Sequence, residues 1–183
     1  SLAPEKKFPY QINEIEGVCK HLLKQYKTIS IMGDSAGANL AFASIRNIKK
    51  YIDNLIMVYT CTQTDYTSNT KFKSVIKNSG KSVLTKESLR DYMSLYLSKP
   101  KDYNNKFVNL LKNNWLFNYP KTIIITGTQD PLHDEGVELK NKLERFNVYV
   151  NHLDIENAKH GFLTSIIDQK YTDNTIEFLK KYL

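Results

Sequence analysis

The residues best placed to do chemistry are the G-x-S-x-G motif at 33–37, with Ser35 at its centre. The motif follows a β-type apolar run at 28–32 and opens a helical run at 38–43. A strand, this motif and a helix, in that order, form a nucleophile elbow, in which a strained turn exposes the serine hydroxyl. We therefore predict that Ser35 is the nucleophile of a serine hydrolase.

Each neighbour of Ser35 has an expected task. Gly33 and Gly37 omit side chains that would block the close approach of strand and helix. The backbone N–H of Ala36, at the start of the helix, is the expected donor to a developing oxyanion. Asp34 is expected to support the elbow through backbone hydrogen bonds, or else to be a solvent-facing turn acid. Small residues also cluster in many tight turns, so a plain strand-to-helix turn is the alternative for the bare motif.

A serine nucleophile needs a base, and the base needs an orienting carboxylate. Asp130 follows the β run at 122–125, on the sheet edge where the elbow also lies. Its alternative role is a helix N-cap, because Pro131 would then be the first helical residue. His160 lies in a loop beyond the last expected strand, beside a glycine. Nucleophile, acid and base then follow in the order Ser35, Asp130, His160, which serine hydrolases with such an elbow require. The other histidines fall in expected helices or a strand: His21, His133 and His152.

The elements that position these residues alternate between strands and helices. Strands are expected at 28–32, 54–59, 121–126 and 148–153, and helices at 11–26, 36–49, 132–146 and 171–183. The continuous apolar run at 55–58 is typical of a strand covered on both faces. We predict one α/β domain over residues 1–183, with a parallel sheet of about four strands flanked by helices.

Residues 60–119 interrupt this alternation and are expected to form a helical, lid-like insertion, with a helix near 86–97. Its apolar side chains would either line an acyl pocket or pack the insertion onto the core: Met93, Leu95, Tyr96, Leu97, Trp115, Leu116 and Phe117. The segment also carries five lysines without an acid between the first and the last: Lys71, Lys73, Lys77, Lys81 and Lys86. They would favour anionic substrates or an anionic membrane surface, or simply form a solvated face.

Composition excludes several other classes of protein. The net charge of +7 comes mostly from lysine spread along the chain, without the aromatic and basic pattern of a nucleic-acid-binding protein. No zinc motif and no apolar run of about 20 residues is present, and the first five residues do not resemble a signal peptide. Cys19 and Cys61 are expected to be buried free thiols in a reducing compartment, so the expected location is the cytoplasm.

Four motifs together resemble those of the hormone-sensitive-lipase-like esterases, a branch of the α/β-hydrolases. They are G-D-S-A-G-A-N-L from Gly33, D-P-L-H-D-E-G from Asp130, H-G-F from His160 and L-A-P-E from Leu2. They span nearly the whole chain in the order that the family requires. The resemblance implies an α/β-hydrolase fold and hydrolysis of carboxylic esters with short or medium acyl chains. It also implies a Ser-His-Asp triad, an acyl-enzyme intermediate and no cofactor or metal.

One part of the family pattern is missing. The family carries H-G-G-G before L-A-P-E, and its glycine N–H groups form much of the oxyanion hole. This sequence has seven glycines, none adjacent to another, so Ala36 is the one expected donor. Loss of one such donor costs on the order of 10²–10³ in turnover. Two alternatives therefore stay open: a catalytically impaired binding or regulatory module, and an arylformamidase or other amidase of the same fold.

The elbow strand raises a second question about completeness. In the α/β-hydrolase fold it is the innermost strand of the last four, so here its apolar residues Ile29–Met32 would lie at a sheet edge. An exposed apolar edge invites pairing with another chain. We predict that this edge is covered by a missing N-terminal half of the fold, by a second polypeptide, or by another copy in a homo-oligomer.

Overall fold

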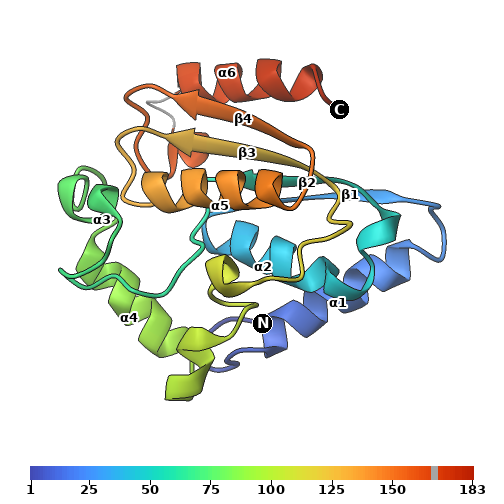
Figure 1. Ribbon diagram of the computed structural model, residues 1–183, viewed down its shortest axis with the longest axis horizontal. Helices are drawn as coiled ribbons and strands as arrows, with labels where there is room; N and C mark the ends of the chain where they lie inside the picture. Colours follow the sequence, from blue (N-terminus) through green and yellow to red (C-terminus); the bar gives the residue numbers. More distant parts are fainter. Residues whose placement is uncertain (166–168) are drawn as a thin grey trace.

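The computed structural model describes residues 1–165 and 169–183 of the chain. A four-stranded, wholly parallel sheet forms its centre, in the order β1-β2-β3-β4 (Figure 1). The strands are β1 (Ile29–Asp34), β2 (Ile52–Val58), β3 (Lys121–Gly127) and β4 (Val150–Ile155). The prediction of an α/β fold with about four parallel strands is confirmed.

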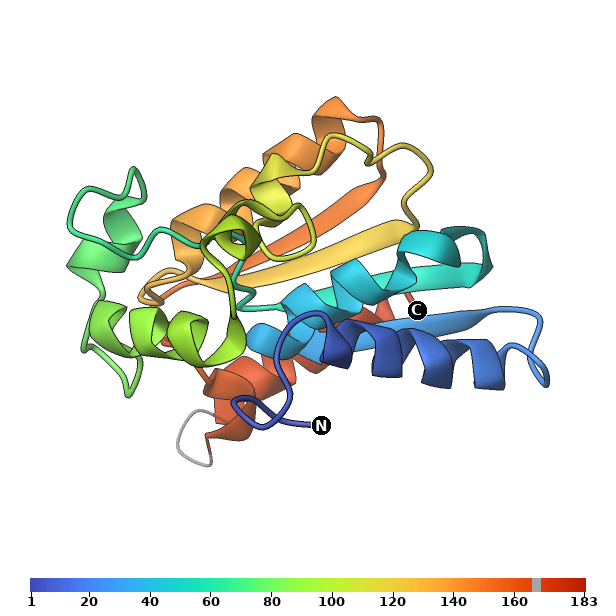
Figure 2. The same cartoon turned by 90° about the horizontal axis from the view of Figure 1, so that it is seen from below.

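Four helices cover the two faces of the sheet: α1 (Tyr10–Leu22), α2 (Ala36–Ser44), α5 (His133–Arg145) and α6 (Gln169–Lys180). Figure 2 shows α1, α2 and α5 across one face, and Figure 1 shows α6 on the other. Successive side chains of β2 point to opposite faces. Leu55 and Met57 therefore pack with α2 and α5, whereas Ile56 and Val58 join the core beneath α6. Burial on both sides explains the unbroken apolar run of this strand.

Some element boundaries differ from those that the sequence predicts. β1 continues past Met32 through Gly33 and Asp34, because these residues still pair with Met57 and Val58 of β2. The strand thus runs into the G-x-S-x-G motif and delivers Ser35 directly at its end. The helix α2 ends earlier than expected and gives way to two short 3-10 turns, Ile45–Asn47 and Lys49–Tyr51. Neither change moves the order of the elements.

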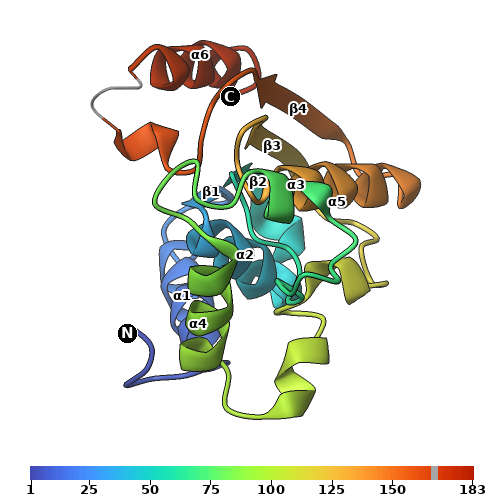
Figure 3. The same ribbon diagram turned by 90° about the vertical axis from the view of Figure 1, so that its left-hand side faces the viewer.

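The part of the insertion that holds α3 (Lys73–Lys77) and α4 (Lys86–Tyr96) lies beyond the carboxyl ends of the strands (Figure 3). Its later residues Leu110, Leu116 and Tyr119 belong to the core cluster on the face that α2 and α5 cover. The predicted helix is present as α4 (Lys86–Tyr96), and a capping box of Thr85 and Ser88 fixes its start. The sequence analysis did not predict the short helix α3 (Lys73–Lys77) or the 3-10 turns Pro100–Asn104 and Leu110–Lys112. A separate apolar cluster holds the insertion together. Four of the five lysines between 71 and 86 are exposed: Lys71, Lys73, Lys77 and Lys81.

Two further predictions about the chain have an outcome. Strand β1 is an edge strand, paired with β2 alone among the described residues, and its Met32 is 49% exposed. What covers this edge stays a prediction. Cys19 and Cys61 are both buried free thiols, as expected. Within residues 1–165 and 169–183, no helix has the length and apolar character needed to cross a membrane.

Candidate active site

The turn between β1 and α2 holds Ser35 in a strained conformation. Its φ of 53° and ψ of −123° are unusual for a residue with a side chain. Its N–H donates to Val58 O at 2.9 Å, which ties the turn to the neighbouring strand. A Cβ on Gly33 would lie 2.3 Å from Gly37 O, so this position has room for glycine alone. A Cβ on Gly37 would meet only Asp34 Oδ1, at 3.9 Å. The packing of strand against helix therefore does not require glycine at position 37, contrary to the prediction.

The structure brings the three predicted site residues together at the carboxyl edge of the sheet. Ser35 Oγ lies 2.9 Å from His160 Nε2, and His160 Nδ1 lies 2.8 Å from Asp130 Oδ2. Asp130 is 1% exposed, and its other oxygen accepts a hydrogen bond from Leu132 N at 2.8 Å. The helix α5 begins at His133 with Leu132 as its N-cap, so Asp130 is not the N-cap. Its carboxylate orients both the imidazole and the turn into α5.

The loops after β3 and β4 are joined so that Asp130 and His160 become neighbours. Gly127 ends β3, and a Cβ there would lie 2.5 Å from Ala158 O. The same carbonyl accepts a hydrogen bond from Gln129 N at 3.0 Å. Because glycine lets the two loops touch, residues 30 positions apart meet at hydrogen-bond distance.

The helix α2 presents its N-terminus to this site. Ala36 is its first residue, and the first four N–H groups of a helix have no intrahelical acceptor. Its N–H therefore remains able to donate beside the Ser35 hydroxyl. One turn later, Asn39 Nδ2 donates to Cys61 O at 2.9 Å and to Val108 O at 2.8 Å. Asn39 thus fastens the insertion, near its beginning and near its end, to the elbow helix.

Comparison with known proteins agrees with this geometry. A sequence-family profile described as "alpha/beta hydrolase fold" matches residues 1–164. The chain belongs to the α/β-hydrolase family. An "Esterase" of Gibberella moniliformis is 27% identical, over 88% of this chain and 54% of that protein. An "Acetyl esterase" of Salmonella choleraesuis is 26% identical, over 89% of this chain and 53% of that protein. A solved fungal esterase structure from Rhizomucor miehei superposes with a TM-score of 0.86 at 25% identity, covering 99% of this chain and 62% of that one.

These relatives are similar to the hormone-sensitive-lipase-like esterases, so the resemblance seen in the motifs is confirmed. The chain spans about half the length of the curated relatives that it matches, 54% and 53% for the two esterases above. The shared region includes the elbow motif and the two loops that carry Asp130 and His160.

The sequence analysis missed Tyr59, which comes directly after β2 of this α/β-hydrolase. Its φ of 35° is positive, and its side chain is 2% exposed. The ring stands edge-on to the His160 ring, with centroids 4.9 Å apart, and edge-on to Phe162 at 5.0 Å. Its hydroxyl donates to Asp34 Oδ2 at 3.1 Å. The pKa of Tyr59 is raised above its usual value, mainly by burial and secondly by the negative charge of Asp34. An aromatic residue at the end of a buried strand was the available signal.

Asp34 therefore supports the elbow differently from the prediction. No backbone N–H within the described residues donates to its carboxylate, and the partner is the Tyr59 side chain. The rest of the carboxylate faces solvent. The alternative of a solvent-facing turn acid is the better description, with one hydrogen bond added.

Glu135 is another residue whose burial the sequence analysis did not predict. It lies in the first turn of α5, where an acid suits the helix dipole, yet it is fully buried. Its Oε1 accepts hydrogen bonds from Thr62 N at 3.2 Å and Tyr66 Oη at 3.1 Å. Burial raises the pKa of this carboxyl well above its usual range. Glu135 joins α5 to the loop after β2 and lies outside the Ser35 site.

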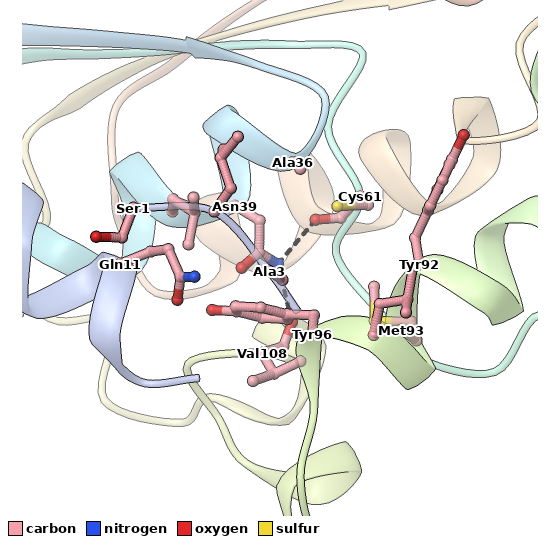
Figure 4. A pocket seen from close by; sticks show the side chains of 13 residues that line it. Ser1, Ala3, Gln11, Ala36, Asn39, Cys61, Tyr92, Met93, Tyr96 and Val108 are labelled. Carbon is pink, nitrogen blue, oxygen red and sulfur yellow. Dashed lines mark hydrogen bonds between the residues drawn. The ribbon is translucent and has the colours of Figure 1, made fainter. Parts of the chain in front are cut away.

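Two small cavities flank the nucleophile. One, of about 230 Å³, is lined by Ser35 and His160 together with apolar residues of the insertion. The other, of about 260 Å³, lies beside Ala36 and is shown in Figure 4. They share four lining residues and therefore adjoin: Ala36, Cys61, Tyr92 and Met93. Within the described chain, no cluster of three or more histidine, cysteine or acidic side chains is arranged to hold a metal ion.

The predicted acyl-pocket residues divide into two groups. Those on α4 line the cavity beside Ala36: Met93, Leu95 and Tyr96. Leu97 and Leu116 are buried in apolar clusters, which is the packing alternative that the sequence analysis left open. For Trp115 and Phe117 both expectations are wrong, because these side chains are 71% and 58% exposed and line neither cavity. The helix faces the site, and the later part of the insertion packs elsewhere.

Proposed function

We propose that this α/β-hydrolase cleaves carboxylic esters with short or medium acyl chains by acyl transfer to Ser35. The observation that carries the proposal is the unbroken line from the Ser35 hydroxyl through the His160 imidazole to the Asp130 carboxylate, with contacts of 2.9 and 2.8 Å. Nucleophile, base and orienting acid stand at distances that proton transfer requires. Relatives named as esterases support the same chemistry.

In the proposed mechanism, His160 Nε2 takes the proton from Ser35 Oγ as this oxygen attacks the ester carbonyl. Asp130 accepts the Nδ1–H of His160, which fixes the reactive tautomer and stabilises the imidazolium. The Ala36 N–H and the N-terminus of α2 stabilise the oxyanion. His160 then protonates the leaving alcohol, and a water molecule, activated by the same base, releases the acid from Ser35.

The dimensions of the cavities favour small substrates. Volumes of about 230 and 260 Å³ lie just below the range of roughly 300–1,000 Å³ typical of drug-sized ligand sites. Two adjoining cavities beside the elbow suit the two arms of an ester, one for the acyl chain and one for the alcohol. A long-chain triacylglycerol would exceed both.

One observation favours a second candidate, a catalytically impaired binding or regulatory module. The sequence offers one donor beside the nucleophile, Ala36, and no adjacent glycines to supply others. We propose that these 183 residues form one domain and that further polypeptide, either more of the same protein or a partner chain, adds the missing donors to the oxyanion hole. The same polypeptide would cover the exposed edge of β1.

The test is turnover of p-nitrophenyl acetate and butyrate by the chain, by Ser35→Ala and by a form extended upstream where the gene encodes one. Ser30→Ala, an exposed serine on the same strand, is the matched control. Turnover that Ser35→Ala abolishes and Ser30→Ala retains supports the esterase. If only the extended form is active, the oxyanion hole is completed from outside this chain. Turnover of anilides in preference to esters would favour the amidase, and no Ser35-dependent turnover in either form would favour the binding module.

A further inference from the structure

Another pocket lies away from Ser35, at the far end of the elbow helix. The helix α2 has nine residues and is about 13 Å long, and this pocket begins just beyond its C-terminal end. Its volume is about 330 Å³, and it shares no lining residue with the two cavities beside Ser35. Its walls come from the two 3-10 turns after α2 and from residues 106–119, the later part of the insertion. The proposed mechanism gives this pocket no task.

Aromatic rings form much of the wall of this pocket. Trp115 is the only tryptophan of the sequence, and its side chain lines the pocket while 71% exposed. Phe107 and the buried Tyr119 complete the aromatic lining. Stacking on Phe42, with ring centroids 4.4 Å apart, holds Tyr119 in place. A largely exposed indole at the wall of a pocket offers its face to a flat ring.

The same pocket carries positive charge. Lys106 Nζ lies 5.3 Å from the ring centroid of Phe107 and 5.8 Å from that of Trp115. Lys49 Nζ lies 4.8 Å from the ring centroid of Tyr119 and donates to one backbone carbonyl at 2.7 Å, which leaves two of its three N–H groups. Among the described residues, no acidic side chain lines the pocket. Both ammonium groups therefore have N–H groups to offer to an anion.

The third cation of the lining, Arg46, already has an anionic partner. Its Nη2 pairs with Glu16 Oε2 at 2.9 Å, and Glu16 Oε1 accepts from Asn47 Nδ2 at 3.0 Å. Glu16 is not itself a lining residue. This ion pair fixes Arg46 as part of the wall, and Lys49 and Lys106 remain as the cations that can hold an anion.

Asn113 adds a neutral donor to the two ammonium groups. It lines the pocket and is 2% exposed. Its Oδ1 accepts from Trp115 N at 2.9 Å, so the orientation of the amide is fixed and the NH2 group is the end that remains. Within the described chain Nδ2 has no acceptor, yet it is not one of the fully enclosed unpartnered atoms. It therefore keeps accessible surface, and a donor in such a place is stabilised by an acceptor.

We propose that this pocket binds a small aromatic acid, with the acid group held by Lys49, Lys106 and Asn113 and the ring against Trp115. A carboxylate or phosphate group would accept from the amide and from the two ammonium groups through charge-assisted hydrogen bonds. A flat ring would cover the exposed indole. An inorganic anion would leave the indole uncovered, and a neutral aromatic compound would give the donors no charged acceptor. The site is separate from Ser35 and does not depend on the proposed esterase function.

The fluorescence of Trp115 reports binding directly, because the chain has no other tryptophan. We expect benzoate and phenyl phosphate to change this fluorescence with saturation, in the wild type and in Ser35→Ala alike. Benzamide, the neutral analogue of benzoate, should bind at least about tenfold more weakly. Cyclohexanecarboxylate keeps the charge without the flat ring and should bind about threefold more weakly. If benzamide bound as tightly as benzoate, or inorganic phosphate as tightly as phenyl phosphate, the inference would be overturned.

Variants place the bound acid in this pocket, with calorimetry of benzoate and phenyl phosphate as the readout. Lys106→Met keeps most of the side-chain stem and removes the charge, so affinity should fall about tenfold. Trp115→Leu removes the indole face and should weaken binding about threefold. Lys50→Met is the matched control: this exposed lysine lies over the Tyr51 ring and does not line the pocket, so affinity should stay within about twofold.

The same variants exclude binding at the nucleophile. An acid that occupied the cavities beside Ser35, as the product of an esterase would, should bind equally to Lys106→Met, Trp115→Leu and the wild type, since neither residue lines those cavities. That result would overturn the inference and leave the esterase proposal untouched. Loss of affinity in both variants, with binding retained in Ser35→Ala, supports the second site even if no ester is turned over. Unfolding curves of each variant verify that lost binding is not lost fold.

Discussion

Two histidines with carboxylate partners lie at the carboxyl edge of this sheet, and only one faces a nucleophile. His160 contacts Asp130 through Nδ1 and the Ser35 hydroxyl through Nε2. His133 contacts Asp134 through Nδ1 at 3.0 Å and Asp154 through Nε2 at 3.1 Å. The first imidazole lies between a carboxylate and a hydroxyl, whereas the second lies between two carboxylates.

The second partner determines what each ring can do. The hydrogen bond to Asp154, partly opposed by burial, raises the pKa of His133 to about 9. His133 is therefore protonated at pH 7, with both ring nitrogens donating and no lone pair to accept a proton. His160 keeps one nitrogen toward a group that has a proton to give. A histidine and aspartate pair is thus suited to general-base chemistry only where the second nitrogen meets a neutral donor.

Exchange of each histidine for glutamine gives the largest expected effect. His160→Gln should lower Ser35-dependent ester turnover by at least about 10³-fold, because the base is lost. His133→Gln should change turnover by less than about threefold, since its ring does not touch Ser35 or the cavity walls. Steady-state kinetics on p-nitrophenyl butyrate measures both. Equal losses in the two variants would mean that the two pairs do not differ in the way proposed.

The carboxylates give the next comparison. Asp130→Asn keeps the shape of the side chain but favours the wrong imidazole tautomer, so kcat should fall by about 10²–10⁴-fold. Asp154→Asn is the matched change at the other pair and should leave kcat within about threefold. Covalent labelling of Ser35 by a fluorophosphonate, followed by mass spectrometry, reports the same difference without ester turnover. Labelling of Asp130→Asn at the wild-type rate would contradict the orienting role.

Much of this comparison could be predicted from the sequence. The elbow motif and the strand runs predict Ser35 and Asp130 at one edge of a parallel sheet, because carboxyl ends of such strands meet there. His160 follows from its place in a loop beyond the last strand. These inferences succeed because each depends on a local pattern and on chain order.

Other features depend on contacts that no local pattern records. Tyr59 and Glu135 look like an ordinary strand end and an ordinary first-turn acid, and only the assembled fold shows that both are buried. In the insertion, the helix near 86–97 is predicted from the sequence and is present as α4, which lines the cavity beside Ala36. Trp115 and Phe117 lie in a segment without a helical period, and there hydrophobicity alone did not show which residues face the site.

The His133 pair should also appear in the pH dependence of stability. The folded pKa of about 9 exceeds the model-compound value of 6.5, so the stabilisation is complete below about pH 6.5 and is lost as the pH rises through about 9. We expect the free energy of unfolding of the wild type to fall by on the order of 2 kcal/mol between about pH 6 and about pH 10, relative to His133→Gln. Denaturant titrations at the two pH values measure this difference. A parallel fall in both proteins would remove the electrostatic distinction between the two histidines.

The smallest expected effect concerns Tyr59, because an aromatic wall beside His160 is a further difference between the two pairs. Tyr59→Phe removes the hydrogen bond to Asp34 but keeps the ring against His160, so it should cost about 1 kcal/mol of stability and change kcat by less than about threefold. Tyr59→Leu removes the ring, and His160 would then be less firmly positioned. We expect kcat to fall about tenfold with little change in KM, because the position of the base matters more to the transition state than to substrate binding. If Tyr59→Phe and Tyr59→Leu reduced kcat equally, the Tyr59 hydroxyl and its hydrogen bond to Asp34 would position His160. The packing of the ring would then matter only for stability.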